Sequence, residues 1–316
     1  MARTIADVPD IRVTRVDANG LVANFYQPVS DTRLPAVIVI SGSDGGVETA
    51  SWFGNPLARH GYAALALAYF DMHTLPRYLV DIPLEYFKTA IDWLRTNPSV
   101  DPRRIAIVGA SRGGEAALLA AATYPEISAV AAIVPSHVMW SGIHPDTSVP
   151  RAAWSHDGMP LPFLRFRYAP GSTSFLEGFV HSLTDQAAVD AALIAVERIN
   201  GPVLLMSGTD DRVWPSSAMA DRAIERLRDH AFAFPYEHVS YEGAGHAVLM
   251  PPWVMAPSGN QWPPRQRELP PWAGQIQIGG TADANQKARA DSWPRLVSFL
   301  GSSLASPLVY SEADLS

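Results

Sequence analysis

The sequence contains no cysteine among its 316 residues, and this absence excludes several kinds of site at once. Disulfide scaffolds, thiolate nucleophiles, cysteine-ligated zinc and iron–sulfur clusters all require thiols. The chain also lacks any lysine- or arginine-rich run, and its formal net charge is −7. A nucleic-acid backbone is therefore not an expected partner, whereas a small molecule is.

Long hydrophobic runs are missing as well. The longest apolar stretches, such as Tyr62–Phe70, are far shorter than the roughly 18 residues that a membrane-spanning helix needs. The N-terminal MARTIADVPD has no apolar core behind a basic start, so no secretory signal is visible. With 47% apolar and 17% charged residues the chain can still build a large core. We expect a soluble globular protein in the cytoplasm, of undetermined oligomeric state.

Short apolar runs alternate with helical patterns along most of the chain. The runs are apolar on both faces, as in strands buried within a parallel sheet, and they are Ala36–Ile40, Ala63–Ala68, Ile105–Gly109, Ala129–Val134, Val203–Ser207 and Glu237–Tyr241. The predicted helices are Trp52–His60, Leu84–Asn97, Gly113–Tyr124, Ser216–Asp229 and Asn285–Leu300. This rhythm predicts one α/β domain over residues 1–316, with a mostly parallel central sheet and helices on both faces.

Two segments interrupt this rhythm. Residues 137–187 are rich in aromatics and fall between two predicted core strands. They are predicted to form a cap inserted over a pocket, the alternative being a long surface excursion packed on the sheet. Residues 251–280 begin with a stretch rich in proline and tryptophan, which predicts an ordered rim loop because proline stiffens the backbone.

The strongest chemical signal is a Gly-x-Ser-x-Gly motif between a predicted strand and an alanine-rich helix, within Arg104–Leu119. The turn in such a motif is so tight that side chains at Gly109 and Gly113 would collide with neighbouring backbone. Ser111 is then held in a strained conformation with its hydroxyl exposed at the helix N-terminus, as a nucleophile requires. The alternative is a Ser-Gly helix cap in another α/β protein.

A serine hydroxyl is a weak nucleophile at neutral pH, so it needs a general base and an acid that orients the base. In α/β hydrolases these follow in the order Ser, Asp or Glu, His. Asp211, the third residue after the strand-ending Gly208, is the predicted acid, and Asp210 is the second candidate. The alternative is that both aspartates only cap the helix that starts near Pro215.

His246 is the predicted base, because it follows the last predicted core strand in the glycine-rich loop Tyr241–His246. The alternative is a structural histidine. The remaining histidines lie at helix ends, in loops at strand ends, or in or beside the inserted segment, where surface and packing roles are more common; they are His60, His73, His137, His144, His156, His181, His230 and His238.

Acyl transfer also needs donors for the oxyanion. We expect the backbone N–H of Arg112 and that of Ser43, with Asp44 as neighbouring candidate, because the loop Ser41–Gly46 follows the first long core strand. This loop lacks the Gly-Lys-Ser/Thr of a phosphate cradle. The chain has no H-E-x-x-H motif and no other clustered metal ligands, so neither a metal nor a cofactor is predicted.

The aromatic insertion suits an apolar acyl or aryl group better than a polar one. Trp140, Trp154 and Trp214 are the predicted substrate-binding residues. The aromatic insertion does not indicate the length of the acyl chain.

Several segments in the right order resemble the bile acid-CoA:amino acid N-acyltransferase and acyl-CoA thioesterase family, in its catalytic C-terminal α/β-hydrolase domain. Besides the Ser111 motif, they are Ile82–Phe87, Ile91–Leu94, Val196–Leu205, Ser207–Ser216, Tyr241–His246 and Gly279–Asn285. The resemblance implies an α/β-hydrolase fold and the hydrolysis or transfer of an acyl group from an activated ester, typically a coenzyme A thioester. It also implies that Ser111, Asp211 and His246 form the triad.

The chain departs from the family pattern in two ways. Animal members carry an N-terminal β-sandwich domain, whereas here about 35 residues precede the first core strand, enough for an edge hairpin around Asn19–Gly20. The amino-acid-conjugating members resemble this chain but use a cysteine nucleophile. Serine here favours water as the acceptor.

The sequence therefore predicts a serine hydrolase that cleaves an acyl thioester through an acyl-enzyme. The alternatives are a carboxylesterase or lactonase for a secondary metabolite, an acyltransferase, a peptidase, and a non-catalytic binding module that grips a hydrophobic ligand. Coenzyme A phosphates could be contacted by Arg77, Arg112, Arg212 or Arg265, although each arginine alone is more typical of a solvated surface.

Overall fold

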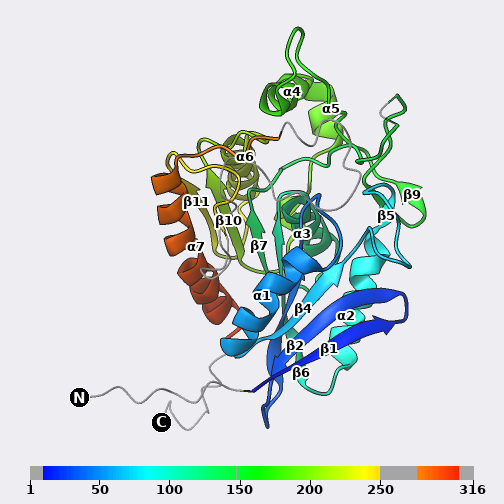
Figure 1. The fold of residues 1–316 in the computed structure, drawn as a ribbon, viewed down its shortest axis with the longest axis vertical. Helices are drawn as coiled ribbons and strands as arrows, with labels where there is room; N and C mark the ends of the chain where they lie inside the picture. The colour runs from blue at the N-terminus through cyan, green and yellow to red at the C-terminus, as the bar shows by residue number, and fades with distance from the viewer. Residues whose placement is uncertain (1–9, 147, 250–275, 306–316) are drawn as a thin grey trace.

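The computed structural model describes residues 10–146, 148–249 and 276–305 (Figure 1). Most of the predicted rim loop, residues 251–275, lies outside these described residues, and so does Arg265.

The core of the molecule is an eight-stranded sheet in the order β1-β2-β4-β3-β6-β7-β10-β11. β1 pairs antiparallel with β2, and β2 pairs antiparallel with β4, while every other neighbouring pair is parallel. The mostly parallel sheet is therefore confirmed. The strands are β1 (Ile11–Ala18), β2 (Leu21–Pro28), β3 (Leu34–Ile40), β4 (Ala63–Ala68), β6 (Val100–Ala110), β7 (Ala129–Ile133), β10 (Val203–Gly208) and β11 (Tyr236–Tyr241).

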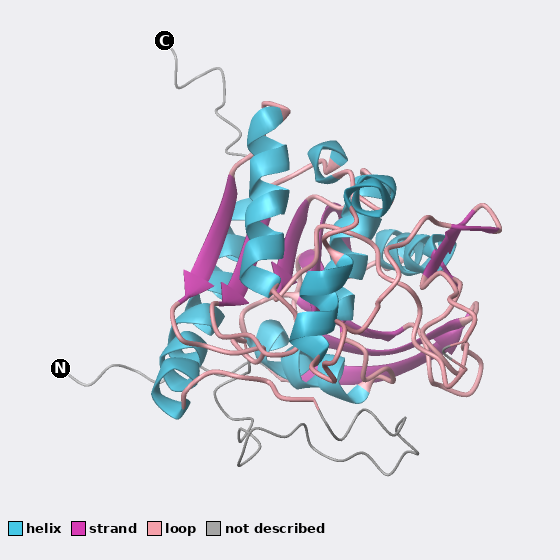
Figure 2. Ribbon diagram, turned by 90° about the horizontal axis from the view of Figure 1, so that it is seen from above, coloured by secondary structure: helices cyan, strands magenta, loops and turns pink. Residues whose placement is uncertain are grey.

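Helices cover both faces of the sheet, as predicted (Figure 2). α1 (Glu48–Arg59) and α7 (Ala282–Ser303) pack on one face. α2 (Leu84–Thr96), α3 (Arg112–Thr123) and α6 (Ser216–Asp229) pack on the other. The three-layer arrangement places the carboxyl ends of the parallel strands at one edge, where ligands bind in open α/β sheets.

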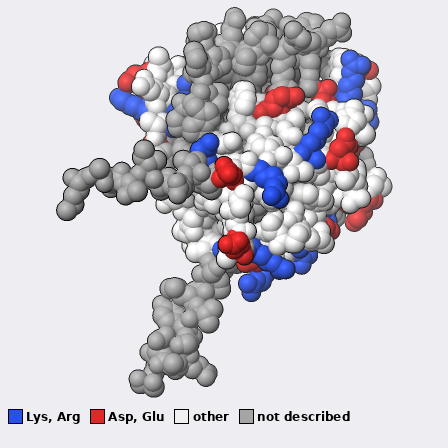
Figure 3. All heavy atoms as spheres, turned by 60° about the horizontal axis from the view of Figure 1, so that its bottom comes forward, with Lys and Arg blue, Asp and Glu red and all other residues white. Residues whose placement is uncertain are grey.

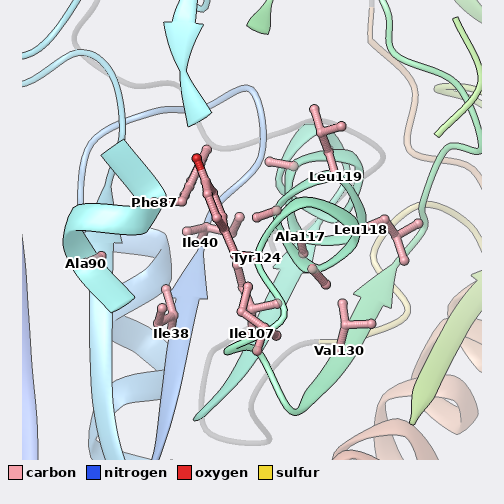
Figure 4. Close-up of a cluster of buried hydrophobic side chains, with 14 of the residues drawn as sticks. Ile38, Ile40, Phe87, Ala90, Ile107, Ala117, Leu118, Leu119, Tyr124 and Val130 are labelled. Carbon is pink, nitrogen blue, oxygen red and sulfur yellow. The ribbon is translucent and has the colours of Figure 1, made fainter. Parts of the chain in front are cut away.

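Alternation along each strand feeds both cores. On β3, Ile38 and Ile40 point into the cluster under α2 and α3, while Val37 and Val39 point into the cluster under α1 and α7. Figure 4 shows the first cluster, where Phe87 of α2 and Leu118 of α3 approach the sheet. Burial of each such aliphatic side chain contributes roughly 1.5–3 kcal/mol to the stability of the fold. Because both faces of these strands are buried, their sequences are apolar on both faces.

The edge hairpin expected near the N-terminus is present. β1 and β2 are joined by Asn19 and Gly20, which have φ values of 55° and 78°. Two consecutive positive φ angles give the turn a twist that matches the flanking strands, and Asn-Gly adopts them readily.

Two of the predicted elements agree with the structure at both ends. β4 and α6 have the predicted bounds. α1 begins at Glu48 rather than Trp52, because Ala50 already belongs to its buried stripe with Phe53 and Leu57. α7 is also longer than predicted, and it begins where the Thr281 hydroxyl accepts the N–H of Ala284 at 3.1 Å.

The segment between β7 and β10, residues 134–202, holds elements that periodicity did not predict. It contains β8 (Trp154–His156), β9 (Met159–Pro160), α4 (Phe175–Ser182), α5 (Gln186–Ala191) and the short helix η1 (Val196–Arg198). β8 and β9 form a second sheet with β5 (Ile82–Pro83). α4 and α5 lie at the top of Figure 1. That residues 137–187 act as a cap remains a prediction.

Among the described residues, no helix combines the length and the apolar character needed to cross a bilayer.

Candidate active site

The tight turn predicted at Ser111 is present between β6 and α3. Ser111 is half-buried and has φ 56°, a strained value for a residue with a side chain. A Cβ atom at Gly109 would lie 2.0 Å from the carbonyl oxygen of Gly113, and one at Gly113 would lie 2.2 Å from the carbonyl oxygen of Ser41. Only glycine fits at these two positions, and their contacts hold the serine at the start of the helix.

Asp211 and His246 come together at the same edge of the sheet. Nδ1 of His246 lies 2.8 Å from Oδ2 of Asp211. A carboxylate can only accept, so Nδ1 carries a proton and donates it, which leaves Nε2 free to act as a base. The exposed fractions of the two side chains are 5% for His246 and 1% for Asp211.

The Asp211 carboxylate is held by three further donors. Its Oδ2 accepts from the Ser216 hydroxyl at 2.6 Å, and its Oδ1 accepts from the N–H groups of Val213 and Trp214 at 2.9 and 3.3 Å. A buried carboxylate is costly unless such bonds compensate it. The Asp211 carboxylate is thus held in place beside the imidazole.

A chain of contacts through the end of β7 connects the serine to the histidine. The Ser111 N–H donates to the carbonyl of Ile133 at 2.8 Å, and the indole N–H of Trp214 donates to the next carbonyl, that of Val134, at 3.1 Å. The rings of Trp214 and His246 lie 6.0 Å apart. Ser111, Trp214 and His246 therefore lie at the same edge of the sheet.

Within the described part of the chain, neither the Ser111 hydroxyl nor Nε2 of His246 makes a hydrogen bond. The structure thus brings His246 to Asp211 but does not place Ser111 within hydrogen-bond distance of the imidazole. Catalytic hydrogen bonds in ligand-free enzymes are often long and tighten when substrate binds.

Asp210, the second candidate for the acid, faces elsewhere. One of its oxygens accepts from the N–H of Gly280 at 3.0 Å, and the other lies 2.6 Å from the Arg212 guanidinium. Its carboxylate holds the loop before α7, so Asp211 is the better candidate.

The loop expected to supply an oxyanion donor lies against the Ser111 turn. A Cβ atom at Gly42 would be 3.1 Å from Cβ of Ser111. Ser43 is exposed, and within the described chain its N–H makes no hydrogen bond, while Asp44 is half-buried. The N–H of Arg112 is the first in α3 and has no intrahelical acceptor. Whether these groups bind an oxyanion remains a prediction.

Sequence reasoning missed a buried ion pair on α3. Nε of Arg112 lies 3.4 Å from Oε2 of Glu115, and the Arg112 guanidinium donates to the carbonyl of Trp140 at 3.1 Å. The other Glu115 oxygen accepts from the indole N–H of Trp154 at 2.6 Å. Burial raises the pKa of Glu115, while the Arg112 charge opposes that shift. The pair joins α3, which begins directly after Ser111, to the inserted segment.

The three tryptophans predicted to bind substrate are each about 1% exposed. Their indole N–H groups all bond internally, Trp140 to the Ser136 hydroxyl at 2.9 Å, and Trp154 and Trp214 as described above. This burial favours a structural role, and direct contact with substrate remains a prediction for these residues.

The arginines considered for coenzyme A phosphates have different surroundings. Arg112 is buried in its ion pair, Arg212 is exposed beside Asp210, and Arg77 is exposed and stacks on Tyr78 with its guanidinium 5.5 Å from the ring centre. On the described residues visible in Figure 3, acidic and basic side chains are interspersed, so that face shows no broad basic patch.

A second serine–histidine–aspartate set lies in β10, β11 and α6. The Ser207 hydroxyl lies 2.7 Å from Nε2 of His238, and Nδ1 of His238 lies 2.8 Å from Oδ1 of Asp221. We call Ser207, His238 and Asp221 the strand triplet, and Ser111, His246 and Asp211 the elbow triplet. Ser207 is fully buried. No sequence signal identifies this set, because it depends on which strands become neighbours.

His137 is another buried histidine, at the start of the inserted segment. It lines a pocket of about 440 Å³ between α5 and α6, to which no member of the elbow triplet contributes. Its Nδ1 has no hydrogen-bond partner within the described residues. Burial, and to a smaller extent the charge of Arg222, lowers the pKa of His137 to about 4.

One group of described residues has the composition of a metal site. Glu85, His156 and Asp157 offer ligand atoms within 4.8 Å of one another. However, Glu85 lies 3.9 Å from Nε2 of His156, whereas Asp157 lies 3.6 Å from Nδ1. A metal bound through one ring nitrogen would leave the carboxylate at the other nitrogen, so this geometry suits an ion-pair cluster and we assign no metal to it.

A family model described as "BAAT / Acyl-CoA thioester hydrolase C terminal" matches residues 82–306. The peroxisomal succinyl-coenzyme A thioesterase of Mus musculus is 26% identical over 316 residues, which cover 97% of this chain and 70% of that protein. Acyl-coenzyme A thioesterase 6 of Homo sapiens is 28% identical over 300 residues, 92% of this chain and 65% of that protein. The chain thus spans about two thirds of these relatives, and the expected cytoplasmic location remains a prediction.

Solved structures share the fold at low identity. A dienelactone hydrolase described as putative, from Klebsiella pneumoniae, is 18% identical with a TM-score of 0.52, covering 92% of this chain and 98% of that one. A dienelactone hydrolase-like promiscuous phosphotriesterase from metagenomic libraries is 16% identical with a TM-score of 0.55, covering 93% and 99%. At this identity the likeness concerns the fold alone, which is that of the α/β hydrolases.

Proposed function

Because the chain belongs to the BAAT / acyl-CoA thioester hydrolase family, we propose that it is a serine thioesterase that hydrolyses acyl-coenzyme A-like thioesters through the elbow triplet. The observation that carries this proposal is the hydrogen bond from Nδ1 of His246 to the buried Asp211, at the edge where Ser111 is held strained. Family membership supports a hydrolase of ester or thioester bonds. The coenzyme A thioesterases among the relatives support the thioester as substrate class.

In the first half of the reaction, the Ser111 oxygen attacks the acyl carbonyl carbon while Nε2 of His246 takes the hydroxyl proton. The carbonyl oxygen becomes an oxyanion, which the N–H groups of Arg112 and Ser43 would stabilise. The carbon–sulfur bond then breaks. The thiolate leaves with the proton from the imidazolium, and the acyl group remains on Ser111 as an ester.

In the second half, water attacks the acyl-enzyme and His246 takes its proton. Collapse of the second tetrahedral intermediate returns that proton to the Ser111 oxygen and releases the carboxylic acid. Asp211 stays ionised throughout and holds the imidazole in the tautomer with a proton on Nδ1. The mechanism uses side chains and backbone donors of this chain and water.

The test is the rate of thiol release from a series of acyl-CoA substrates, measured with a thiol-reactive dye. Because the chain has no cysteine, the protein adds no background signal. We expect turnover by the wild type that is lost in Ser111→Ala. If no acyl-CoA is turned over by an enzyme whose Ser111 still reacts with a fluorophosphonate, the thioester assignment is wrong and an ester or lactone takes its place. A folded protein that resists the fluorophosphonate would overturn the serine mechanism.

A further inference from the structure

Tyr69 lies directly after β4, next to the loop that is expected to hold the oxyanion. It is 1% exposed. Its hydroxyl donates to two successive backbone carbonyls, that of Ser41 at 3.0 Å and that of Gly42 at 2.9 Å. One proton shared between neighbouring carbonyls fixes the orientation of both peptide units.

The other side of this loop is fixed by the turn of the nucleophile. The Ser41 carbonyl is the group that a Cβ at Gly113 would meet at 2.2 Å, so it lies against the first turn of α3. Gly42 faces Ser111, with only 3.1 Å between the position of its missing Cβ and Cβ of Ser111. The loop is therefore held between the Tyr69 hydroxyl and the Ser111 turn.

A planar trans peptide unit directs its N–H opposite to its C=O. The carbonyl of Gly42 and the N–H of Ser43 belong to one such unit, and the carbonyl is bound to Tyr69. The N–H of Ser43 must therefore point away from Tyr69. Resting on the proposed function, we propose that Tyr69 is a positioning residue that aims the Ser43 N–H as an oxyanion donor.

Tyr69 is suited to this role because its own position is fixed. Its ring packs against Phe70, Phe87 and Trp154 at centroid distances of 5.1, 5.8 and 5.8 Å. Burial, followed by the negative charge of Asp44, raises the pKa of Tyr69 well above its usual range. The hydroxyl thus keeps its proton and remains a donor at every pH at which the enzyme would work.

The test compares Tyr69→Phe with a matched control, Tyr86→Phe. The Tyr86 hydroxyl also bonds backbone groups beside the end of β4, since it donates to the carbonyl of Ala68 at 2.7 Å and accepts the N–H of Val22 at 3.1 Å. Each variant loses one oxygen and its backbone hydrogen bonds. Only Tyr69 touches the loop that contains Ser43.

For Tyr69→Phe we expect kcat for thioester hydrolysis and the second-order rate of fluorophosphonate labelling to fall about ten-fold, less than the 10² to 10³ lost when an oxyanion donor is removed outright. KM should stay within about two-fold, because the donor acts on the transition state. Tyr86→Phe should keep both rates near the wild-type values, with a similar fall in Tm.

The labelling rate separates failure of this proposal from failure of the proposed function. Wild-type protein that is not labelled at all would overturn the serine mechanism. If the wild type is labelled and Tyr69→Phe reacts at the same rate, or if both variants lose rate equally, then Tyr69 has no role beyond stability. A variant whose KM rises while kcat is retained would also overturn the assignment, because it would mean that Tyr69 affects ground-state binding.

Discussion

The elbow triplet and the strand triplet contain the same three residue types and the same 2.8 Å separation between histidine Nδ1 and aspartate. By hydrogen bonds alone the strand triplet is the more complete, because its serine also bonds the imidazole. Yet Ser207 is fully buried in β10, between β7 and β11, so no acyl carbonyl can reach it. Hydrogen-bond connectivity is therefore a poor criterion for a catalytic set.

The two sets differ most in the surroundings of the serine and of the acid. Ser111 stands on a strained turn at the N-terminus of α3, where free N–H groups can meet an oxyanion, whereas Ser207 lies in a regular strand. The acid side is reversed, since Asp211 is 1% exposed and Asp221 is 63% exposed. The elbow triplet therefore combines a partly exposed serine with a buried aspartate, and the strand triplet combines a buried serine with an exposed aspartate.

Replacing each serine in turn should separate the two triplets most clearly. We expect Ser111→Ala to lose at least about 10⁴-fold in kcat/KM, because nucleophile and base act as a unit. Ser207→Ala should keep activity within about two-fold. The measurement is thiol release from an acyl-CoA, together with intact mass after fluorophosphonate treatment. Adduct formation on Ser111→Ala, or loss of labelling in Ser207→Ala, would reverse the assignment.

Replacing each aspartate by asparagine tests the acids. Asp211→Asn should reduce kcat by about 10³- to 10⁴-fold, since the amide no longer holds the imidazole with its proton on Nδ1. Asp221→Asn should leave kcat within about three-fold. Steady-state kinetics of the two purified variants is the measurement, and circular dichroism checks that both are folded. Equal losses in the two variants would mean that the acids are not distinguished by their burial.

The part of the site that follows from local sequence could be predicted. Glycines at 109 and 113 mark a turn that no other residue fits, and the order of Ser111, Asp211 and His246 along the chain follows the order of the strands. The same holds for β4 and α6, whose predicted bounds match the structure because apolar periodicity encodes both elements locally.

Contacts between distant segments could not be predicted in this way. The bond from Trp154 to Glu115 joins the inserted segment to α3, and the one from His238 to Ser207 depends on β10 and β11 being neighbours. The burial of the tryptophans predicted to bind substrate also depends on such contacts, because Trp154 bonds Glu115 and Trp214 bonds the carbonyl of Val134. An aromatic-rich segment identifies apolar surface, while three-dimensional packing decides whether that surface faces a ligand or the core.

His137 is a further buried histidine, and within the described residues it has no carboxylate partner, unlike His246 and His238. Its pKa of about 4 lies below the 6.5 of an unfolded histidine, so the unfolded chain binds the extra proton first as the pH falls. The contribution of His137 to the free energy of unfolding is therefore fully present above about pH 6.5. It is lost as the pH falls towards 4, and the loss is about 3 kcal/mol at most.

His137→Asn should remove this part of the pH dependence while keeping activity at neutral pH. The free energy of unfolding, measured in urea between pH 4 and pH 7.5, should have a shallower slope in the variant than in the wild type. Parallel curves for the two proteins would mean that His137 titrates normally in the folded state.

The smallest expected difference concerns two buried serines that each bond one member of a triplet. Ser216 donates to Asp211 at 2.6 Å, and Ser207 bonds His238. Replacement of either by alanine removes one hydrogen bond and should cost about 1 kcal/mol of unfolding free energy. Only Ser216→Ala should also slow catalysis, by about five-fold in kcat, because it loosens the carboxylate that orients His246. If both variants instead keep the same kcat and lose the same stability, the backbone donors alone hold Asp211 well enough. The Ser216 hydrogen bond would then contribute to folding and not to catalysis.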